Sequence, residues 1–459
     1  MTTLGGLLQI GRSAIVTHQA ALSVVSSNTA NADTVGYAKR DVQFSSLAAG
    51  GGVGIGAVLR RSSDLVAQRV LLANGRLGAH QAMSDGLGAL EGKFTDREAG
   101  LGGSLDAFFA ALRTLATDPA DAQLRGDVLA RADALTSAFS DAAATIDRER
   151  RGTDGAISVE LARVNQLAAQ IADANERVAS TAPDTADRAE QLDRRQQLVD
   201  ELGGLVQLTT LPAADGTLTL LVQGGATLVQ GANAASLRGT PDAANGGLLR
   251  VDLVDVSGAA LDVTDDLRGG SIGGRLMLRD ETFVATADSL DQLAYDLATS
   301  FNAVHGAGFG TDGVSGRDLF APPAQVAGAA AGFALAPGMI DNPAWFAAAD
   351  TAAGASGNND NLLAMLALAD APLAAGGTLT AGQQVASMIG EIGRNARAET
   401  DAADEAAASL EQNQALLQSA TGVSIDEELV DLTRYQRAYQ AGARIISTVD
   451  TLFDTLLAL

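Results

Sequence analysis

The chain has 459 residues, enough for two or three domains of ordinary size, and its formal net charge of −24 disfavours nucleic acid, because phosphate groups would repel it. Hydrophobic residues make up 47% of the chain but aromatic residues only 4%, which favours long, closely packed helices with small aliphatic cores. The absence of cysteine excludes a disulfide framework, a thiolate metal site and a cysteine nucleophile.

The first segment predicts an amphipathic helix that packs against a partner helix. Its apolar positions alternate in steps of four and three residues, the spacing of a coiled-coil seam. The expected seam residues are Leu4, Leu8, Ile15, Leu22 and Val25. The segment does not open with a signal-peptide pattern, and no stretch of the chain is apolar enough to span a membrane. We therefore expect no membrane partner, and any export to use a route that removes no signal peptide.

Further helical periods follow on both sides of the middle of the chain. Residues 124–146 and 157–178 hold apolar positions at helical spacing, and 385–396 repeats the pattern late in the chain. We expect these stretches to be long antiparallel helices of one bundle, built from both halves of the sequence.

The middle of the chain predicts a mixed, partly β region. Apolar and polar residues alternate from about Leu205, and Asp215–Gly216 is typical of a hairpin turn. Residues 251–256 predict another strand, and 283–304 predict a helix. The stretch 306–361, rich in Gly, Ala, Pro and Asn, permits no assignment.

The last segment mirrors the first. It predicts a coiled-coil helix whose expected seam residues are Leu432, Tyr435, Tyr439, Ile446, Val449, Phe453 and Leu456. Because two isolated helices of this length are marginal in water, we expect the ends to pair with each other. We also expect them to be loosely ordered in the free monomer and to fold fully when subunits pack together.

No motif predicts chemistry. The histidines His18, His80 and His305 lack the spacing of metal ligands, and the glycine run 50–56 lacks the G-x-G-x-x-G pattern of a dinucleotide loop. We expect that run to be a flexible hinge beside the first helix. Carboxylates are abundant, but nothing in the sequence selects a catalytic pair. We therefore expect no catalytic, cofactor-binding or metal-binding residues, and no enzyme.

Residues 27–40 resemble the N-terminal signature of the axial proteins of the bacterial flagellum, the rod, hook and hook-associated proteins. The matching positions are Asn28, Ala30, Asn31, Thr34, Gly36 and Tyr37. Thr29 and Val35 replace the isoleucine and proline that are usual there. The resemblance implies that these residues take part in assembly.

The end of the chain is similar to the hook-associated branch of that family, which forms the first junction between hook and filament. The positions of this C-terminal signature are Gly422, Asp426, Glu427, Glu428, Gln436 and Ala438. Residues 108–112, 118–119, 191–202 and 269–280 also resemble the interior of these proteins.

The pattern and the resemblance together predict a mainly α fold with a β-containing outer domain. Paired N- and C-terminal coiled-coil helices would adjoin a long helical bundle domain, with a mixed or β domain inserted centrally. The expected segments are 1–58 and 421–459 for the two halves of the coiled-coil domain, 59–204 and 346–420 for the two parts of the bundle, and 205–345 for the outer domain. A helix over about 280–304 is expected in the outer domain or in the bundle.

The resemblance implies a structural subunit of a homo-oligomeric ring at the hook–filament junction, outside the cell. It implies secretion by the flagellar type III export apparatus. The implied partners are other copies of the chain, the flagellar hook protein, the second junction protein (hook-associated protein 3), and an export chaperone on the C-terminal helix. Alternatives remain another flagellar axial protein such as the hook protein, a secreted enzyme, or an adhesin displayed by the central domain.

Overall fold

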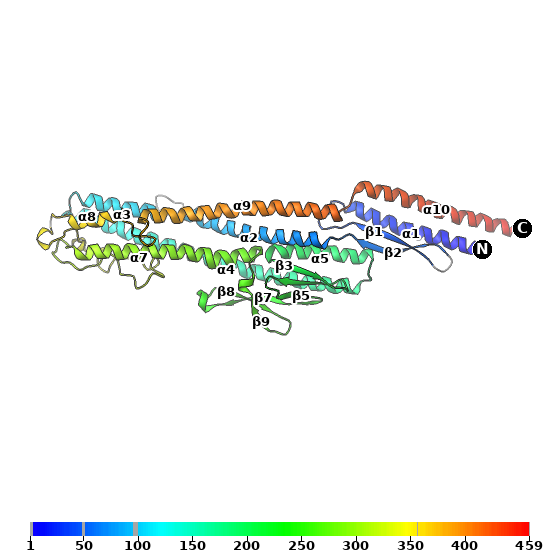
Figure 1. The fold of residues 1–459 in the computed structure, drawn as a ribbon, viewed down its shortest axis with the longest axis horizontal. Coiled ribbons are helices and arrows are strands. Elements are labelled where there is room, and N and C mark those ends of the chain that lie inside the picture. The colour runs from blue at the N-terminus through cyan, green and yellow to red at the C-terminus, as the bar shows by residue number, and fades with distance from the viewer. Residues whose placement is uncertain (1–2, 48–50, 95–99, 356, 459) are drawn as a thin grey trace. The chain divides into compact units, whose positions relative to one another are not determined.

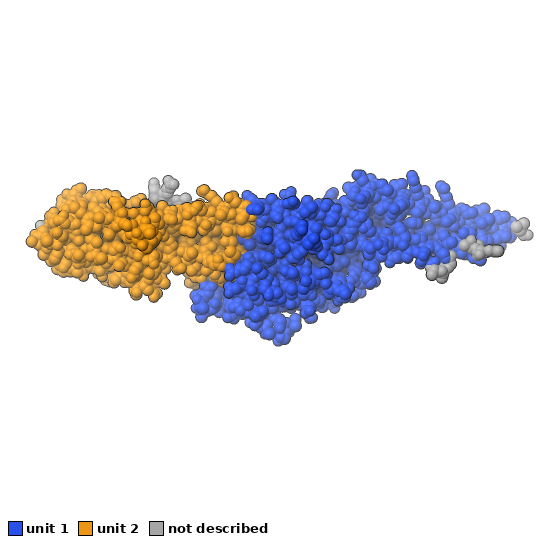
Figure 2. All heavy atoms as spheres, viewed as in Figure 1, with its two compact units in different colours: residues 1–79, 159–273, 404–459 blue, residues 80–158, 274–403 orange. Residues whose placement is uncertain are grey.

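The computed structural model describes residues 3–47, 51–94, 100–355 and 357–458. The chain forms two compact units, coloured separately in Figure 2. Unit 1 comprises Met1–Ala79, Val159–Gly273 and Asp404–Leu459, and unit 2 comprises His80–Ser158 and Gly274–Ala403. Each unit is therefore assembled from distant parts of the sequence. The domain boundaries expected from the sequence stay a prediction.

Helices account for most of the described chain, with small antiparallel sheets in the middle, which confirms the expected fold class. The long helices that contribute residues to both units are α2 (Asp64–Phe94), α4 (Ala122–Ser180) and α9 (Ala381–Thr421). The remaining helices are α1 (Leu4–Ala30), α3 (Leu101–Leu115), α5 (Ala186–Leu205), α6 (Gly270–Met277), α7 (Phe283–Ala307), α8 (Asp360–Ala367) and α10 (Ile425–Leu457).

Both predicted terminal helices are present in unit 1 and lie side by side (Figure 1). Helix α1 begins where the Thr3 hydroxyl accepts a hydrogen bond from the Gly6 N–H (3.2 Å), which satisfies one of the free amides of the first turn. Helix α10 begins with Asp426, Glu427 and Glu428, whose negative charges complement the helix dipole.

The glycine run is not a hinge in its described part, 51–56, because it leads into a strand. Strand β2 (Val53–Arg60) pairs antiparallel with β1 (Arg40–Ser46), and the hairpin lies along α1 (Figure 1). A side chain at Gly56 would approach the Ser45 Cβ to 3.1 Å, so glycine fits where the cross-strand neighbour fills the space. The expectation was wrong because it weighed glycine's flexibility and overlooked the period-two pattern of Val53 and Ile55.

Two small antiparallel sheets follow α5, and they confirm the predicted Asp215–Gly216 hairpin and the strand near 251. The first contains β3 (Leu208–Pro212), β4 (Leu218–Val222), β5 (Thr227–Gln230) and β6 (Asn233–Ala234). The second contains β7 (Ser236–Pro241), β8 (Leu249–Val254) and β9 (Ala260–Asp262). All seven strands belong to unit 1.

Two asparagines of α4 hold these sheets against the helix. The Asn165 amide donates to the Leu237 carbonyl (2.8 Å) and accepts from the Leu237 N–H (2.7 Å). Asn175, fully buried, donates to the carbonyls of Leu218 (2.8 Å) and Gly231 (2.9 Å) and accepts from the Leu218 N–H (3.0 Å). Each amide pairs with backbone as a neighbouring strand would, so both sheets are fixed to one helix.

Unit 2 has a core rich in phenylalanine. Phe108 of α3 and Phe301 of α7 lie 5.3 Å apart between ring centroids, and Phe320 of the following loop lies 5.9 Å from Phe301. The described residues of the stretch 306–361, which the sequence left unassigned, have little regular structure but include Phe320 and Phe346, which are completely buried. Apolar anchors therefore order this loop without strands or long helices. Among the described residues, no helix is long and apolar enough to cross a membrane.

His305, in the last turn of α7, is a buried, neutral ring. Its Nδ1–H donates to the Arg317 carbonyl (2.7 Å), and its Nε2 accepts from the Ala347 N–H (3.0 Å), which fixes the tautomer. Burial lowers the pKa of His305 to about 4, because charging the ring inside the core is unfavourable. The ring thus ties two points of the long loop to the helix.

This burial predicts a pH dependence of unit 2. Because His305 binds a proton less readily in the folded state, its contribution is complete above about pH 6.5 and is lost as the pH falls toward 4, on the order of 3 kcal/mol in total. Denaturant unfolding of wild type and His305→Gln at about pH 7 and pH 4.5 measures it, and the variant should lose less stability on acidification. His80→Gln, which removes a partly exposed histidine of unit 2, is the matched control for the loss of a histidine as such. Identical pH profiles for wild type and His305→Gln would contradict the prediction.

Candidate functional site: the paired terminal helices

Helices α1 and α10 run antiparallel in close contact. A Cβ on Gly11 would lie 2.8 Å from Cγ1 of Ile446 and 3.2 Å from the Gly442 carbonyl oxygen. A Cβ on Gly442 would lie 3.1 Å from Cβ of Ala14. Facing glycines let the two backbones approach, as small residues do at tightly packed helix crossings.

The predicted seam residues divide by exposure along the pair. Val25, Tyr435 and Val449 are buried, and Val25 and Tyr435 share a small core with Ala21. The half-buried seam residues are Leu4, Ile15, Leu22, Leu432 and Ile446. The exposed ones are Leu8, Tyr439, Phe453 and Leu456. The pair is therefore covered near its base by the core of Ala21, Val25 and Tyr435 and farther along by Val449, and its cover is thinnest at the last turns of α10.

The buried amide of Asn28 joins the two signatures. Its Nδ2 donates to the Arg40 carbonyl (3.0 Å) and to Oε2 of Glu428 (3.0 Å). Its Oδ1 accepts from the Tyr37 hydroxyl (2.8 Å) and from the Arg40 N–H (3.1 Å). The Asn28 side chain thus donates two hydrogen bonds and accepts two at the same time. Only an amide group on a side chain of this length can do so here.

Asn31, Thr34 and Gly36 shape the turn that brings Tyr37 back to α1. The Asn31 side chain donates to the Ser27 carbonyl (2.9 Å) at the end of the helix, and the Tyr37 N–H donates to the Thr34 carbonyl (3.1 Å). Gly36 has φ of +82°, the left-handed region that favours glycine. Ala30, by contrast, is exposed at the end of α1, and its methyl group has no hydrogen-bonding atom.

Gly36 supports a prediction about this turn. Gly36→Ala is expected to cost about 1–3 kcal/mol, because the left-handed backbone disfavours a side chain and the new Cβ would lie 2.9 Å from Cγ of Gln197. Gly225→Ala is the matched control: φ is +88° and no atom lies within 4 Å of the new Cβ, so it reports backbone strain alone. Denaturant unfolding of both variants measures the difference. Equal losses of unfolding free energy in the two variants would show that the Gln197 side chain moves aside without cost.

Lys39 is the residue of this site that the sequence did not predict. Its Nζ lies 2.9 Å from Oε1 of Glu428 and 2.8 Å from Oε2 of Glu427, and the Lys39 and Glu428 side chains are almost completely buried. Burial lowers the pKa of Lys39, but its hydrogen bonds to the two carboxylates outweigh that effect and raise the pKa above its ordinary value. The ammonium group is therefore charged at neutral pH and joins the loop after α1 to the first turn of α10.

A second ion-pair group, also not predicted, joins the hairpin to α5. Asp193 accepts from Nε of Arg60 (2.6 Å) and from a terminal nitrogen of Arg40 (3.3 Å). The Val58 N–H donates to the Asp184 carbonyl (2.7 Å) at the loop before α5. The hairpin is therefore attached at both strands, and it carries Lys39 and Arg40 at its base.

Of the other residues of the C-terminal signature, Gly422 and Asp426 lie at the connection between α9 and α10, and Gln436 and Ala438 lie farther along α10. The Gly422 N–H donates to the Gln418 carbonyl (2.7 Å), and a Cβ at Gly422 would lie 2.4 Å from that oxygen. Asp426 and Gln436 are exposed and Ala438 is half-buried. Of this signature, the structure thus brings only Glu427 and Glu428 to the contact with Asn28 and Lys39.

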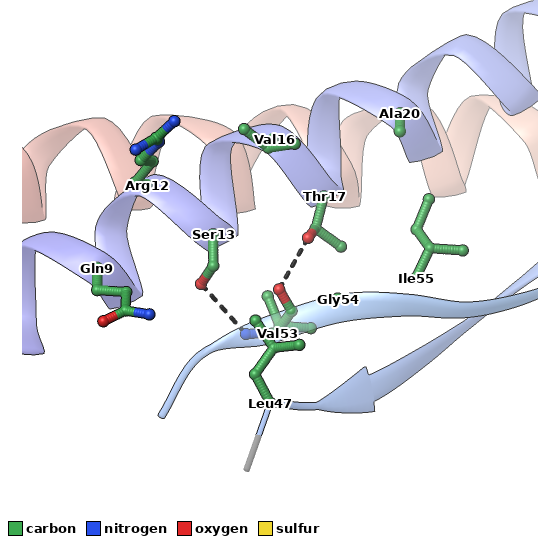
Figure 3. A pocket seen from close by; sticks show the side chains of 10 residues that line it. All are labelled: Gln9, Arg12, Ser13, Val16, Thr17, Ala20, Leu47, Val53, Gly54 and Ile55. Carbon is green, nitrogen blue, oxygen red and sulfur yellow. Dashed lines mark hydrogen bonds between the residues drawn. The ribbon is translucent and has the colours of Figure 1, made fainter. Parts of the chain in front are cut away.

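A groove lies between α1 and the hairpin (Figure 3). It has a volume of about 540 Å³, and its walls carry Val16 and Ala20 from the helix and Leu47, Val53 and Ile55 from the hairpin. The Thr17 hydroxyl donates to the Val53 carbonyl (2.8 Å), which fixes the hairpin against the helix.

The next residue of α1, His18, stacks on Tyr435 (6.1 Å between ring centroids). Burial, followed by the nearby Arg434 charge, lowers the pKa of His18. Within the part of the chain described, no three metal-ligating side chains converge.

Family models match three segments of the chain. The model described as the flagellar hook-associated protein FlgK helical domain matches residues 87–320, just over half of the chain. The flagella basal body rod protein model matches residues 8–37, and the model for the C-terminal part of the flagellar basal body rod FlgEFG proteins matches 412–459. The two rod-type matches include most of α1 and all of α10.

Several curated relatives carry the name flagellar hook-associated protein 1. The relative from Salmonella typhimurium is 29% identical over 328 residues, which cover 69% of this chain and 59% of the relative. The relative from Escherichia coli is 25% identical over 550 residues, covering 99% of this chain and 100% of the relative. A solved structure of the flagellar hook junction protein FlgK from Burkholderia pseudomallei aligns with a TM-score of 0.68 at 16% identity, over 78% of this chain and 100% of that one. The structural likeness shows a shared fold.

Proposed function

The chain belongs to the family of the flagellar hook-associated protein FlgK, and we propose that it is a structural subunit of the junction between flagellar hook and filament. The observation that carries the proposal is the contact between the two signatures, in which Asn28 and Lys39 meet Glu428 at the base of the terminal helices. This contact joins residues 400 positions apart and presents α1 and α10 together as one unit for assembly.

Another axial protein, such as the hook protein, is the alternative that shares the terminal helices. The match of 87–320 to the hook-associated helical domain favours the junction, because the rod-type models cover only the ends. Electron microscopy of flagella from a strain that lacks the chain distinguishes the two. We expect hooks without filaments, restored by the wild-type gene; the absence of hooks would favour the alternative, and normal filaments would contradict both.

We include in the proposal a ring of identical subunits outside the cell, between the hook protein and hook-associated protein 3. Export through the flagellar type III apparatus would deliver the subunits, and a chaperone on the C-terminal helix would keep them apart before export. Large apolar side chains are exposed on α10, among them Ile425, Leu429 and Val430, and they support the proposal that a chaperone binds this helix. Pull-down of the chaperone by the full chain, and its loss on changing Leu429 and Val430 to serine, would test this step.

We further propose that the chain is not an enzyme. The family is structural, and among the described residues neither a metal-ligating cluster nor a selected pair of carboxylates suggests catalysis. The central β region would then serve only as an outward-facing part of the subunit, and neither an enzyme nor an adhesin is needed to explain it.

Free subunits are expected to fray at the open end of the terminal helices. Trypsin should cleave after Arg12 and Arg444 roughly tenfold faster than after Arg434, because Arg434 lies next to Tyr435 in the small core with Ala21 and Val25, whereas Arg12 and Arg444 lie nearer the exposed last turns of α10, from which fraying would start. Mass spectrometry of a timed digest of the free full chain measures the order of cleavage. Equal rates at Arg434 and Arg444 would show that the pair opens as a whole, and resistance at all three arginines would contradict the expected mobility.

A further inference from the structure

Helix α10 is longer than the helix it pairs with. Asn28 lies opposite Glu428, and Gly11 lies opposite Gly442 and Ile446. Continued at this register, Phe453 lies opposite Thr3, so the last turn of α10 extends past the beginning of α1. The exposed apolar side chains of this segment, here called the α10 tip, are Leu452, Phe453, Leu456 and Leu457, with exposures of 45%, 41%, 58% and 84%.

The groove between α1 and the hairpin has the complementary character. Its walls are mainly aliphatic, and Val16, which lines it, is 59% exposed. Its volume of about 540 Å³ lies within the range of about 300–1,000 Å³ that holds a small organic molecule, so it accommodates the apolar side chains of one helix end.

Charge favours the same match. Arg12 is the one charged residue among the residues that line the groove, and it is exposed. Asp454 lies within the α10 tip and Asp450 just before it, and no lysine or arginine follows Arg444 in the sequence. The helix end is therefore apolar and negatively charged, and the groove is apolar with one positive charge at its edge. Opposite charges of this kind favour the approach of the two surfaces.

The occupant cannot be the tip of the same chain. At the observed register Val16 lies opposite about residue 440, so Phe453 of the same chain is about 20 Å away along α10 at 1.5 Å per residue. A contact between these two surfaces must therefore join two copies. Because the two surfaces differ, the contact is head-to-tail, the type that produces a ring or a helical array.

We propose that the α10 tip of one subunit inserts into the α1–hairpin groove of the next subunit. Phe453 and Leu456 would fill the apolar walls beside Val16, and Asp450 or Asp454 would pair with Arg12. This inference rests on the proposed function, since it names the contact by which junction subunits join each other.

Disulfide cross-linking tests the contact directly, because the chain has no cysteine of its own. Val16→Cys and Phe453→Cys are made in separate genes and expressed together in a strain that lacks the natural copy. Oxidised junctions from swimming cells should contain at least about tenfold more cross-linked dimer than the control pair, since a disulfide needs Cα atoms within about 7 Å. The control pair is Val159→Cys with Phe453→Cys, because Val159 is also an exposed valine of unit 1 (72%) but lies on α4.

The outcomes separate this proposal from the proposed function. Cross-linked dimer above the control supports insertion of the tip. Swimming cells with normal filaments but no cross-link above the control overturn the inference and leave the junction role intact. Normal filaments in the strain that lacks the chain altogether would instead overturn the junction role.

A charge exchange gives an answer even if a cysteine variant blocks assembly. Arg12→Asp and Asp454→Arg should each slow swimming about fivefold, and the double variant should recover most of the wild-type rate, because the reversed pair attracts again. A double variant no better than either single variant would overturn the pairing of Arg12 with the tip.

Discussion

Replacing Lys39 by methionine is expected to lower the free energy of opening between the loop after α1 and helix α10 by about 3–5 kcal/mol. The Lys39 side chain is 4% exposed and that of Glu428 is 1% exposed, so the variant leaves a buried carboxylate without its cation. The Asn28 amide would then be its one remaining described partner. Hydrogen exchange of the amides at 39 and 428 in the full chain measures this opening.

Two further variants isolate the buried pair from the exposed one. Glu427→Gln removes a carboxylate that also contacts Lys39 but is 60% exposed, and it should cost no more than about 1 kcal/mol. The double variant Lys39→Met, Glu428→Met should recover at least half of the loss, because two apolar groups need no counter-charge. A Lys39→Met variant as stable as wild type would show that water reaches Glu428, and the ion pair would then have no structural role.

The terminal helices could be predicted from the sequence because their signal is local. Apolar residues repeat every three or four positions, and the acidic start of α10 complements the helix dipole. The same holds for the hairpin around Asp215–Gly216, where turn residues separate two alternating runs. In each case a short window of sequence contains all the information that the element requires.

The contacts of the site could not be predicted in this way. Lys39 and Glu428 are separated by most of the chain, and nothing near Lys39 indicates that its charge is buried rather than solvated. Asn175 lies at an apolar position of its helix period, yet it is the amide that fixes a sheet to α4. One signal was available: Lys39 is one of only two lysines in a chain of 459 residues, and it lies within the signature segment 27–40.

Replacing Ile446 and Val449 together by aspartate is expected to abolish junction assembly and swimming. Val449 is 1% exposed, and Ile446 lies against Gly11 at the closest approach of the two helices. The carboxylate at 449 would be buried without a partner, and the one at 446 would lie half-buried against Gly11, so both oppose the pairing of the two helices. Unit 2 does not contain these residues, so the helical signal that it contributes should remain.

The matched control keeps the apolar volume of the contact. Ile446→Val with Val449→Ile exchanges one methylene between neighbouring sites, a change that cores usually tolerate at less than about 1.5 kcal/mol. Cells with this variant should swim, whereas cells with the aspartate variant should carry hooks without filaments. Normal swimming of the aspartate variant would show that α1 and α10 need not pair for assembly. The subunits would then have to join through residues outside the terminal helices. The proposed insertion of the α10 tip would also be contradicted, because it requires that α1 and α10 pair.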